Sequence, residues 1–172
     1  SVQDIAGLAA VCAAHGLPLL VDDAHGAYRR FLPGDLHPIA QGAAMCCDSA
    51  HKTLPVLTGG AYLHLGPNAS VQDEATVRNT LNLFGSTSPS YLLLQSLDAA
   101  NAALAGEWPR RLAECCKALE ELRQNINAFA PGFALAGSTP DREPLKLTLD
   151  AAAVGCTGGA LADYLRIHAI EC

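Results

Sequence analysis

The 172-residue sequence has few of the features that mark nucleic-acid-binding, membrane-spanning or secreted proteins. It has no cluster of lysine and arginine, its formal net charge is −6 and only 5% of its residues are aromatic, which disfavours a nucleic-acid partner. No apolar run is as long as a membrane span, because glycine, proline or a charge interrupts each one. The N-terminal stretch lacks the basic segment of a secretory signal, so we expect a cytoplasmic protein.

Cysteine is present, but not in the patterns of a metal or disulfide framework. The chain has seven cysteines, an odd number, with no C-x-x-C pair and no recurring spacing. Both adjacent pairs, Cys46–Cys47 and Cys115–Cys116, lie in apolar surroundings. The sequence therefore predicts no metal site, and it predicts that the cysteines are small buried residues in a reducing compartment.

Half of the residues are hydrophobic, which is enough for a sizeable core. Three short apolar runs, at 17–21, 43–47 and 61–65, show no polar alternation, and this is typical of strands buried on both faces of a parallel sheet. Helical patterns lie between and around these runs, so we expect an α/β layered sheet. In such sheets ligands bind beyond the carboxyl ends of the strands.

Capping and breaking residues predict the first three helices. Asp4 can cap a helix that ends at about Gly16, and Ser70 with Asp73 forms a loose capping box for a helix to about residue 83. Pro89 fits the first turn of a helix that runs to about residue 104.

The C-terminal part has a different hydrophobic pattern. Pro109 begins a long helix with one apolar face, and the alternating segment 144–150 predicts a strand with one solvated face. Thr157 can cap a last helix to about His168, and the final AIEC has the pattern of an interrupted strand.

Lys52 is the residue that most needs explanation, because it lies between two of the apolar runs in the stretch DSAHKTL. An isolated lysine at a strand end usually packs its stem and extends its ammonium into water. A lysine that forms a Schiff base instead needs an apolar surround and a nearby cation, which lower its pKa. Asp22 follows the first apolar run and can supply the carboxylate that a pyridoxal cofactor needs at its pyridinium nitrogen.

Three stretches in this order, VDDAHGAYRRF, DSAHKTLPVLTGGAYLHL and FGSTSPSYLLLQSLDAA, resemble the bacterial ornithine/lysine/arginine decarboxylases. These are type I pyridoxal-phosphate enzymes, with the aspartate-aminotransferase-like fold. PLKLTLD and TGGALADYLRIHAIE are similar to the start of the family's C-terminal region, so the resemblance covers nearly the whole chain. It departs at Ala50, where the family often has threonine, and at Tyr28, where it often has histidine.

The resemblance implies a role for each matching residue around pyridoxal 5'-phosphate. Lys52 would hold the cofactor as a Schiff base, and Asp22 would pair with its pyridinium nitrogen. Ala24 would lie against a face of the ring, and His25 would reach the phenolic oxygen unless it is only a packed histidine at a strand end. Ser49 would donate to the phosphate.

Three further residues complete the expected site. His51, beside the lysine, would lie near the phosphate and the imine. Ser86 and Thr87 would approach the phosphate of a neighbouring subunit, although Thr87 is equally suited to capping the helix after Pro89. The expected catalytic residues are thus Lys52, His51 and Asp22.

The fold that the resemblance implies is part of a three-layer large domain, with a mainly parallel sheet and flanking helices, plus the start of an α+β C-terminal domain. Residues 1–106 would form the C-terminal half of the cofactor-binding large domain. Residues 107–172 would form a linking helix and the beginning of the small domain. Family members carry further sequence on both sides of the matching region, so the chain has the pattern of an internal or truncated piece.

The implied function is decarboxylation of ornithine, lysine or arginine to a diamine or agmatine, a step of polyamine metabolism, in a homodimer or higher homo-oligomer. Two alternatives stay open from the residues. One is another type I enzyme, an oxoamine synthase or a cysteine desulfurase, which shares D-x-A-H-G and H-K but lacks the longer motifs. The other is a truncated fragment that keeps Lys52 without catalysing a reaction.

Overall fold

The computed structural model describes residues 3–86, 88–135 and 143–171 of the chain. The chain divides into two compact units, Asp4–Leu112 and a second unit that combines Ala113–Cys172 with Ser1–Gln3. Each unit is described by itself.

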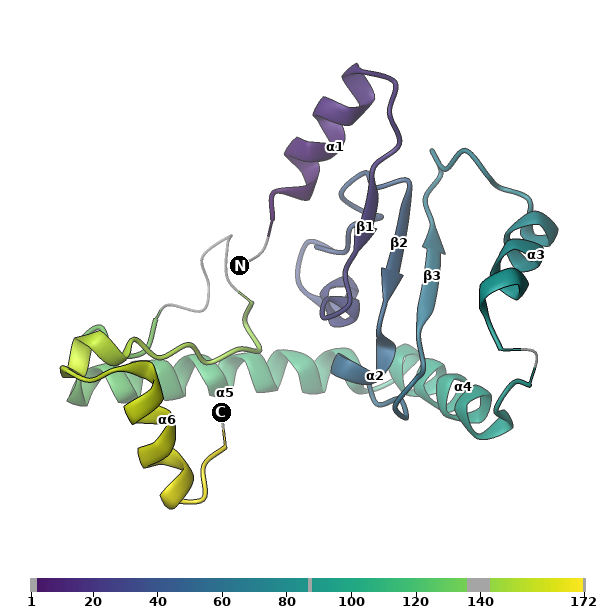
Figure 1. The fold of residues 1–172 in the computed structure, drawn as a ribbon. Coiled ribbons are helices and arrows are strands. Elements are labelled where there is room, and N and C mark those ends of the chain that lie inside the picture. Colours follow the sequence, from purple (N-terminus) through teal and green to yellow (C-terminus); the bar gives the residue numbers. More distant parts are fainter. Residues whose placement is uncertain (1–2, 87, 136–142, 172) are drawn as a thin grey trace. The chain divides into compact units, whose positions relative to one another are not determined.

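The first unit consists of a small sheet with helices around it (Figure 1). Its elements are α1 (Ile5–Ala14), β1 (Leu20–Asp22), the 3₁₀ helix η1 (Ala27–Phe31), β2 (Met45–Asp48), α2 (Ala50–Thr53), β3 (Tyr62–Leu65), α3 (Glu74–Phe84), α4 (Tyr91–Ala105) and the beginning of α5 (Trp108–Phe129). The predicted α/β character is confirmed for the described residues.

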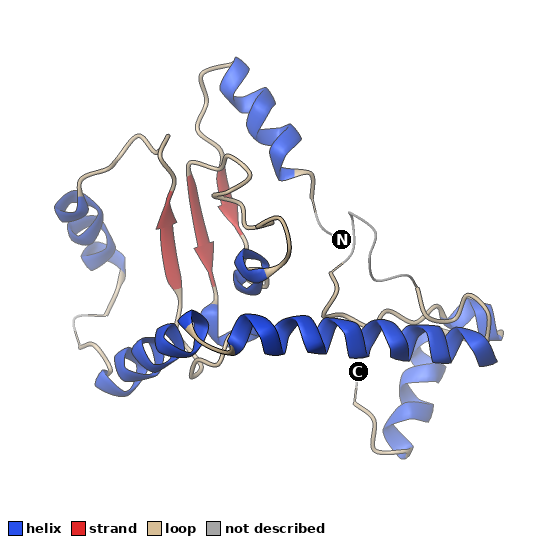
Figure 2. Ribbon diagram, turned by 180° about the vertical axis from the view of Figure 1, so that it is seen from behind, coloured by secondary structure: helices blue, strands red, loops and turns tan. Residues whose placement is uncertain are grey.

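The sheet has the strand order β1-β2-β3 and is mixed (Figure 2). β1 runs parallel to β2, with Asp22 opposite Cys47, whereas β3 runs antiparallel to β2, with Tyr62 opposite Asp48. The predicted parallel arrangement is therefore found for β1 and β2 but not for β3. The physical reason lies in the connection between β2 and β3, which contains only the four-residue α2 and a turn with Gly59 at φ 99°. Such a connection lets the chain turn around and run antiparallel to β2. A parallel β3 would need a longer crossover, usually a helix, that returns the chain to the other end of the sheet.

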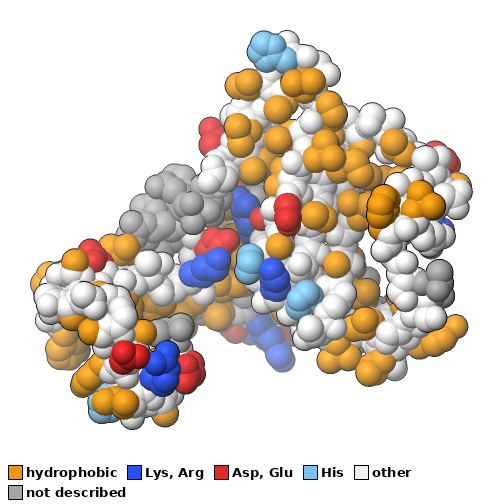
Figure 3. Space-filling view, viewed as in Figure 1, with side chains coloured by type: hydrophobic (Ala, Val, Ile, Leu, Met, Phe, Trp, Pro, Cys, Tyr) orange, Lys and Arg blue, Asp and Glu red, His pale blue; other side chains and the backbone are white. Residues whose placement is uncertain are grey.

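The strands lie within or beside the predicted apolar runs, but β1 is not buried on both faces. It begins at Leu20 rather than Leu17, and these two side chains are 61% and 62% exposed. β1 is one of the two edge strands of the described sheet, so its outer edge has no neighbouring strand there. Figure 3 shows hydrophobic side chains on one face of the unit. Leu8 and Val11 of α1 are also exposed.

Small side chains form much of the core around β2. Ala43, Ala44, Cys46 and Ala50 are each at most 1% exposed. The backbone also approaches closely here, because a Cβ on Gly66 would meet the Ala43 carbonyl oxygen at 2.4 Å. A larger side chain at these positions would have to displace the backbone, which fixes β2 firmly within the unit.

The helix starts follow the capping chemistry of the sequence, with small shifts. Asp4 caps α1 as predicted, accepting from the Gly7 N–H at 2.9 Å. Asp73 caps α3. Ser90 rather than a residue before Pro89 caps α4, which begins at Tyr91. Serine and aspartate accept well from the free N–H groups of a first helical turn.

The second unit contains the rest of α5, the 3₁₀ helix η2 (Ala151–Val154) and α6 (Gly158–Ile167). Thr157 caps α6 as predicted. The predicted strand at 144–150 is wrong, because only an isolated antiparallel bridge joins Leu149 to Ala134. The buried Arg123 of α5 explains this difference, since its Nη2 donates to the carbonyl oxygens of Pro144 and Lys146 at 2.9 and 2.7 Å.

The expected strand at the end of the chain is also wrong for its described residues, 169–171. Ala169 has φ 61°, in the left-handed region, and the Ile170 N–H donates to the Leu165 carbonyl at 3.0 Å. This is the way in which a helix is closed at its C-terminus, so the backbone groups there serve α6 rather than a sheet. None of the described helices combines the length and the apolar character that crossing a membrane requires.

Candidate active site

Six of the eight predicted site residues, namely Asp22, Ala24, His25, Ser49, His51 and Lys52, lie at or just after the carboxyl ends of two neighbouring strands. β1 ends at Asp22 and β2 ends at Asp48, and the two strands are parallel and hydrogen-bonded to each other. Parallel neighbours end at the same edge of a sheet. The segments after them, 23–26 and 49–53, therefore leave the sheet side by side, at the place where ligands bind in α/β proteins.

Asp22 is exposed and holds the beginning of the segment that follows β1. Its Oδ1 accepts from the Ala24 N–H at 3.2 Å and from the Cys47 Sγ at 3.8 Å. Burial raises the pKa of the Cys47 thiol, and the Asp22 carboxylate raises it further. Cys47 thus stays a neutral thiol that donates toward Asp22. Ala24 is half-buried and His25 is exposed in the same segment.

Ser49, His51 and Lys52 lie on a tight turn that begins directly after β2. Ser49 precedes the first residue of α2, and its hydroxyl makes no capping hydrogen bond. The Lys52 N–H donates to the Ser49 carbonyl at 3.0 Å. The Leu54 N–H donates to the Ala50 carbonyl at 2.9 Å, which is the last hydrogen bond of the turn. Ala50 is completely buried, whereas Lys52 is exposed, so the turn packs on the core through Ala50 and presents Lys52 to the outside.

His51 is oriented by two hydrogen bonds to one carbonyl group. Its ring Nδ1 and its backbone N–H both lie near the Gly60 oxygen, at 3.0 and 3.2 Å. A carbonyl only accepts, so Nδ1 carries the proton and Nε2 of the neutral ring is the free base. Gly60 itself is constrained, because a Cβ there would meet Val56 Cγ1 at 2.3 Å.

Lys52 is exposed, so the apolar surround expected for it is absent from the described residues. It nevertheless differs from the other two lysines of the chain. Lys117 lies 3.8 Å from Glu121, and Lys146 lies 2.5 Å from Glu143. A neighbouring carboxylate favours the protonated amine, and among the described residues none forms an ion pair with Lys52.

The structure does not bring Ser86 to this edge. Its hydroxyl accepts from the Ser88 N–H at 3.1 Å in the exposed segment between α3 and α4, and no described hydrogen bond joins it to the strand ends. Thr87 lies outside the described residues. Both stay predictions that concern a neighbouring subunit.

The two positions that depart from the family pattern are packing residues. Tyr28 is 1% exposed and Ala50 is completely buried. The changes at these positions therefore alter side chains of the core.

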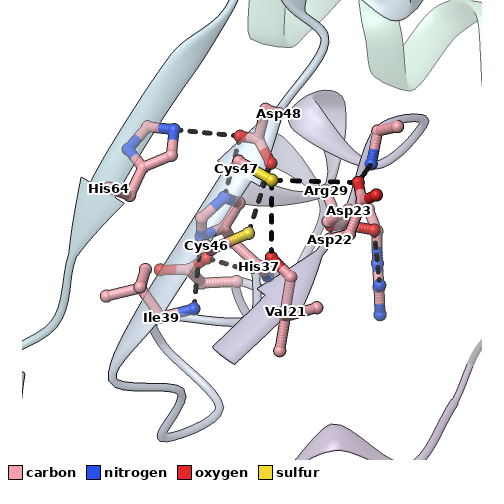
Figure 4. A network of polar contacts seen from close by, with 12 residues as sticks. Val21, Asp22, Asp23, Arg29, His37, Ile39, Cys46, Cys47, Asp48 and His64 are labelled. Atoms are coloured by element: carbon pink, nitrogen blue, oxygen red, sulfur yellow. Dashed lines mark hydrogen bonds and ion pairs between the residues drawn. The ribbon is translucent and has the colours of Figure 1, made fainter. Parts of the chain in front are cut away.

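A second polar group, which the sequence did not suggest, lies beside the turn (Figure 4). One oxygen of Asp48, Oδ2, accepts from His37 Nε2 at 3.0 Å and from His64 Nε2 at 2.9 Å. The other oxygen, Oδ1, accepts from the Cys46 thiol at 3.4 Å. Asp48 and His37 are buried, and the side chain of His64 is 38% exposed. We call His37, Asp48 and His64 the buried network.

The protonation of the buried network follows from its partners. Burial by itself would raise the pKa of Asp48, but the hydrogen bonds from His37 and His64 outweigh it and hold the pKa well below its usual range. The Ile39 N–H donates to His37 Nδ1 at 3.3 Å, so Nε2 carries the proton of the neutral ring. The network is thus an ionised carboxylate that accepts from two imidazole N–H groups.

These three side chains could also hold a metal ion by distance, since their ligand atoms lie within 4.8 Å of one another. His37 Nδ1 accepts a hydrogen bond, whereas metal binding through Nε2 requires Nδ1 to donate one. A histidine that binds a metal through Nε2 donates from Nδ1 to an acceptor, whereas here Nδ1 faces a backbone donor. The geometry favours a hydrogen-bonded network.

The buried network lies on the opposite face of the sheet from Asp22. Side chains alternate along a strand, and the register places Asp22 with Cys47 on one face and Cys46, Asp48 and His64 on the other. A cavity of about 660 Å³ borders this second face, with His37, Asp48 and His64 among its lining residues.

Comparison with known proteins identifies the family. The family model described as "Orn/Lys/Arg decarboxylase, major domain" matches residues 4–142, which include both strand ends and the turn with Lys52. The chain belongs to the Orn/Lys/Arg decarboxylase family. The predicted resemblance is thereby confirmed.

Curated relatives agree with this family. The chain is 36% identical to the uncharacterized protein YaaO of Bacillus subtilis over 78% of its own length and 29% of that protein. It is 32% identical to an arginine decarboxylase of Halalkalibacterium halodurans and 30% identical to one of Bacillus subtilis, over 92% and 95% of its length. These alignments cover 33% and 34% of the two decarboxylases, so the chain spans about a third of the relatives it matches.

The residues at the strand ends fit the donor set that pyridoxal phosphate requires. They offer a carboxylate at Asp22, a primary amine at Lys52 that forms no ion pair with any described residue, a hydroxyl without a capping bond at Ser49 and a small side chain at Ala24. This cofactor binds through an amine, a carboxylate near its ring nitrogen and donors to its phosphate.

Proposed function

We propose that the chain carries the lysine-bearing part of a pyridoxal-phosphate-dependent decarboxylase of basic amino acids. The observation that supports this most is the position of Asp22 at the carboxyl end of β1 and of Lys52 in the turn directly after the carboxyl end of the parallel neighbour β2. The two relatives named arginine decarboxylase favour arginine over ornithine and lysine as the substrate. We expect the intact enzyme to be a homodimer or a larger homo-oligomer.

Each residue of the site would have a distinct task. The cofactor, when bound, supplies an electron sink for bond cleavage at the substrate Cα. Lys52 would hold it covalently through Nζ, and the Asp22 carboxylate would keep the ring nitrogen protonated by pairing with it. The Ser49 hydroxyl, which makes no capping bond, would donate to the phosphate.

His51 would hold the proton that the reaction moves. Its Nδ1 is committed to the Gly60 carbonyl, so only Nε2 can gain or lose a proton without breaking a hydrogen bond. Proton return to the substrate Cα would come from this nitrogen or from Lys52.

Reductive trapping tests the proposal on the chain as it exists. The protein is incubated with pyridoxal phosphate, reduced with borohydride, digested and mapped by mass spectrometry. We expect the label on Lys52. The variant K52R should lose it, because a guanidinium forms no such adduct, whereas K117R and K146R should keep it.

A label spread evenly over the lysines, or none at all, would contradict the proposal and support a non-catalytic piece. Release of carbon dioxide from arginine, ornithine and lysine in an intact relative of this family then separates decarboxylation from acyl transfer to glycine or sulfur release from cysteine.

A further inference from the structure

Two side-chain hydrogen bonds join the turn with Lys52, and the Asp48 residue before it, to the segment that contains β3. His51 bonds to the carbonyl of Gly60, just before β3, and Asp48 accepts from His64 within β3. Asp48 is also the residue that immediately precedes Ser49. The orientation of the Asp48 side chain and the direction in which the chain leaves β2 are therefore coupled.

The buried network is built to hold Asp48 in one orientation. A carboxylate that accepts two N–H groups on one oxygen and a thiol on the other has few alternative rotamers. His37 comes from the loop after η1 and His64 comes from β3, so the carboxylate joins three separate segments of the first unit. Hydrogen bonds to an ionised group are stronger than neutral ones, and burial keeps water from replacing them.

The geometry points to His37 and His64 as positioning residues that act through Asp48 on the turn Ser49–Lys52. This inference rests on the role proposed for Lys52, but it makes a separate claim about the cofactor-free chain. If Asp48 loses a donor, the carboxylate can rotate, and the Ser49 carbonyl that accepts from the Lys52 N–H is no longer fixed. The backbone hydrogen bonds of the turn then break more often, and the position of Lys52 becomes less well defined.

His64 is the better position for a test, because its side chain is partly exposed and tolerates substitution more readily than the buried His37. In H64Q the amide nitrogen reaches about as far as imidazole Nε2, so it can still donate to Asp48. In H64N the side chain is shorter, so its amide falls short. Both variants are polar and neutral, and they differ mainly in this one hydrogen bond. H15N, at the exposed end of α1, is the matched control.

Hydrogen exchange of the cofactor-free protein measures the turn directly. We expect the amides of His51 and Lys52 to exchange about tenfold faster in H64N than in the wild type, and H64Q to restore most of the protection. H15N should leave both amides unchanged. Equal exchange in H64N and H64Q, or an acceleration spread evenly over the first unit, would overturn the positioning role.

A second measurement links the turn to its proposed chemistry. The rate of reductive labelling of Lys52 by pyridoxal phosphate should fall in H64N and recover in H64Q, while labelling of Lys117 stays the same. If the wild type shows no label on Lys52, the proposed function fails, whereas the exchange experiment still decides whether His64 positions the turn.

Discussion

Substitution of Asp48 by asparagine isolates the charge at the centre of the buried network. D48N keeps the shape of the side chain and one acceptor oxygen, so the two imidazole donors that lie at 3.0 and 2.9 Å can still bond to it. A hydrogen bond to a charged acceptor contributes about 1.5–3 kcal/mol, and a neutral one about 0.5–1.5 kcal/mol. Two such losses lower the free energy of unfolding by about 2–3 kcal/mol, or roughly 10 °C in melting temperature for a unit of this size.

Thermal melting followed by circular dichroism measures this loss, with D73N as the control. Asp73 is the exposed cap of α3, and asparagine caps a helix as well as aspartate does, so D73N should melt like the wild type. A D48N protein that melts within about 2 °C of the wild type would refute the reasoning that the charge of Asp48 stabilises the fold.

The pH dependence of the same comparison has a defined direction. Because the folded-state pKa of Asp48 is lowered, its contribution to stability is complete above the unfolded carboxyl pKa of about 3.9. It is lost only as the pH falls through the lower folded value. The difference between wild type and D48N should therefore be full at neutral pH and close only in strongly acidic solution.

Three further predictions concern stability and metal binding. Replacing the buried Arg123 by methionine leaves two carbonyls without their donor and should cost about 3 kcal/mol in urea unfolding, whereas the same change at the exposed Arg78 should cost less than about 0.5 kcal/mol. G60A should lower the melting temperature, because the new methyl group meets Val56, while G159A in α6 has free space and should raise it slightly. Zinc should leave the melting temperature unchanged, and a zinc-dependent rise that H64N abolishes would instead show that the buried network binds metal.

The candidate site could be predicted only in part. The carboxylate of Asp22 and the amine of Lys52 were visible because polar residues at the ends of apolar runs follow from the layout of an α/β sheet. The buried network was not visible, since His37 stands in a loop and His64 within an apolar run, 11 and 16 positions from Asp48. The antiparallel register of β2 and β3, which places His64 opposite Cys46, brings His64 to Asp48, and the fold of the loop after η1 brings His37 there.

The secondary structure could also be predicted only in part, with the starts of α1 and α6 predicted correctly and the segment 144–150 predicted wrongly. Asp4 and Thr157 cap the helices that the sequence assigned to them, because capping depends on residues three positions apart. The segment 144–150 alternates like a strand, yet Arg123 from α5 takes two of its carbonyl groups. A donor that is more than 20 positions away in the chain leaves no trace in the local pattern.

By itself, the sequence determined the family, the helix starts and the residues that end β1 and β2, because these depend on motifs and on neighbours close in the chain. The tertiary structure alone decided the direction of β3, the exposure of Lys52 and the three-way contact at Asp48. These features depend on which segments meet in space, and long-range pairing is set by the packing of the whole unit rather than by any short stretch.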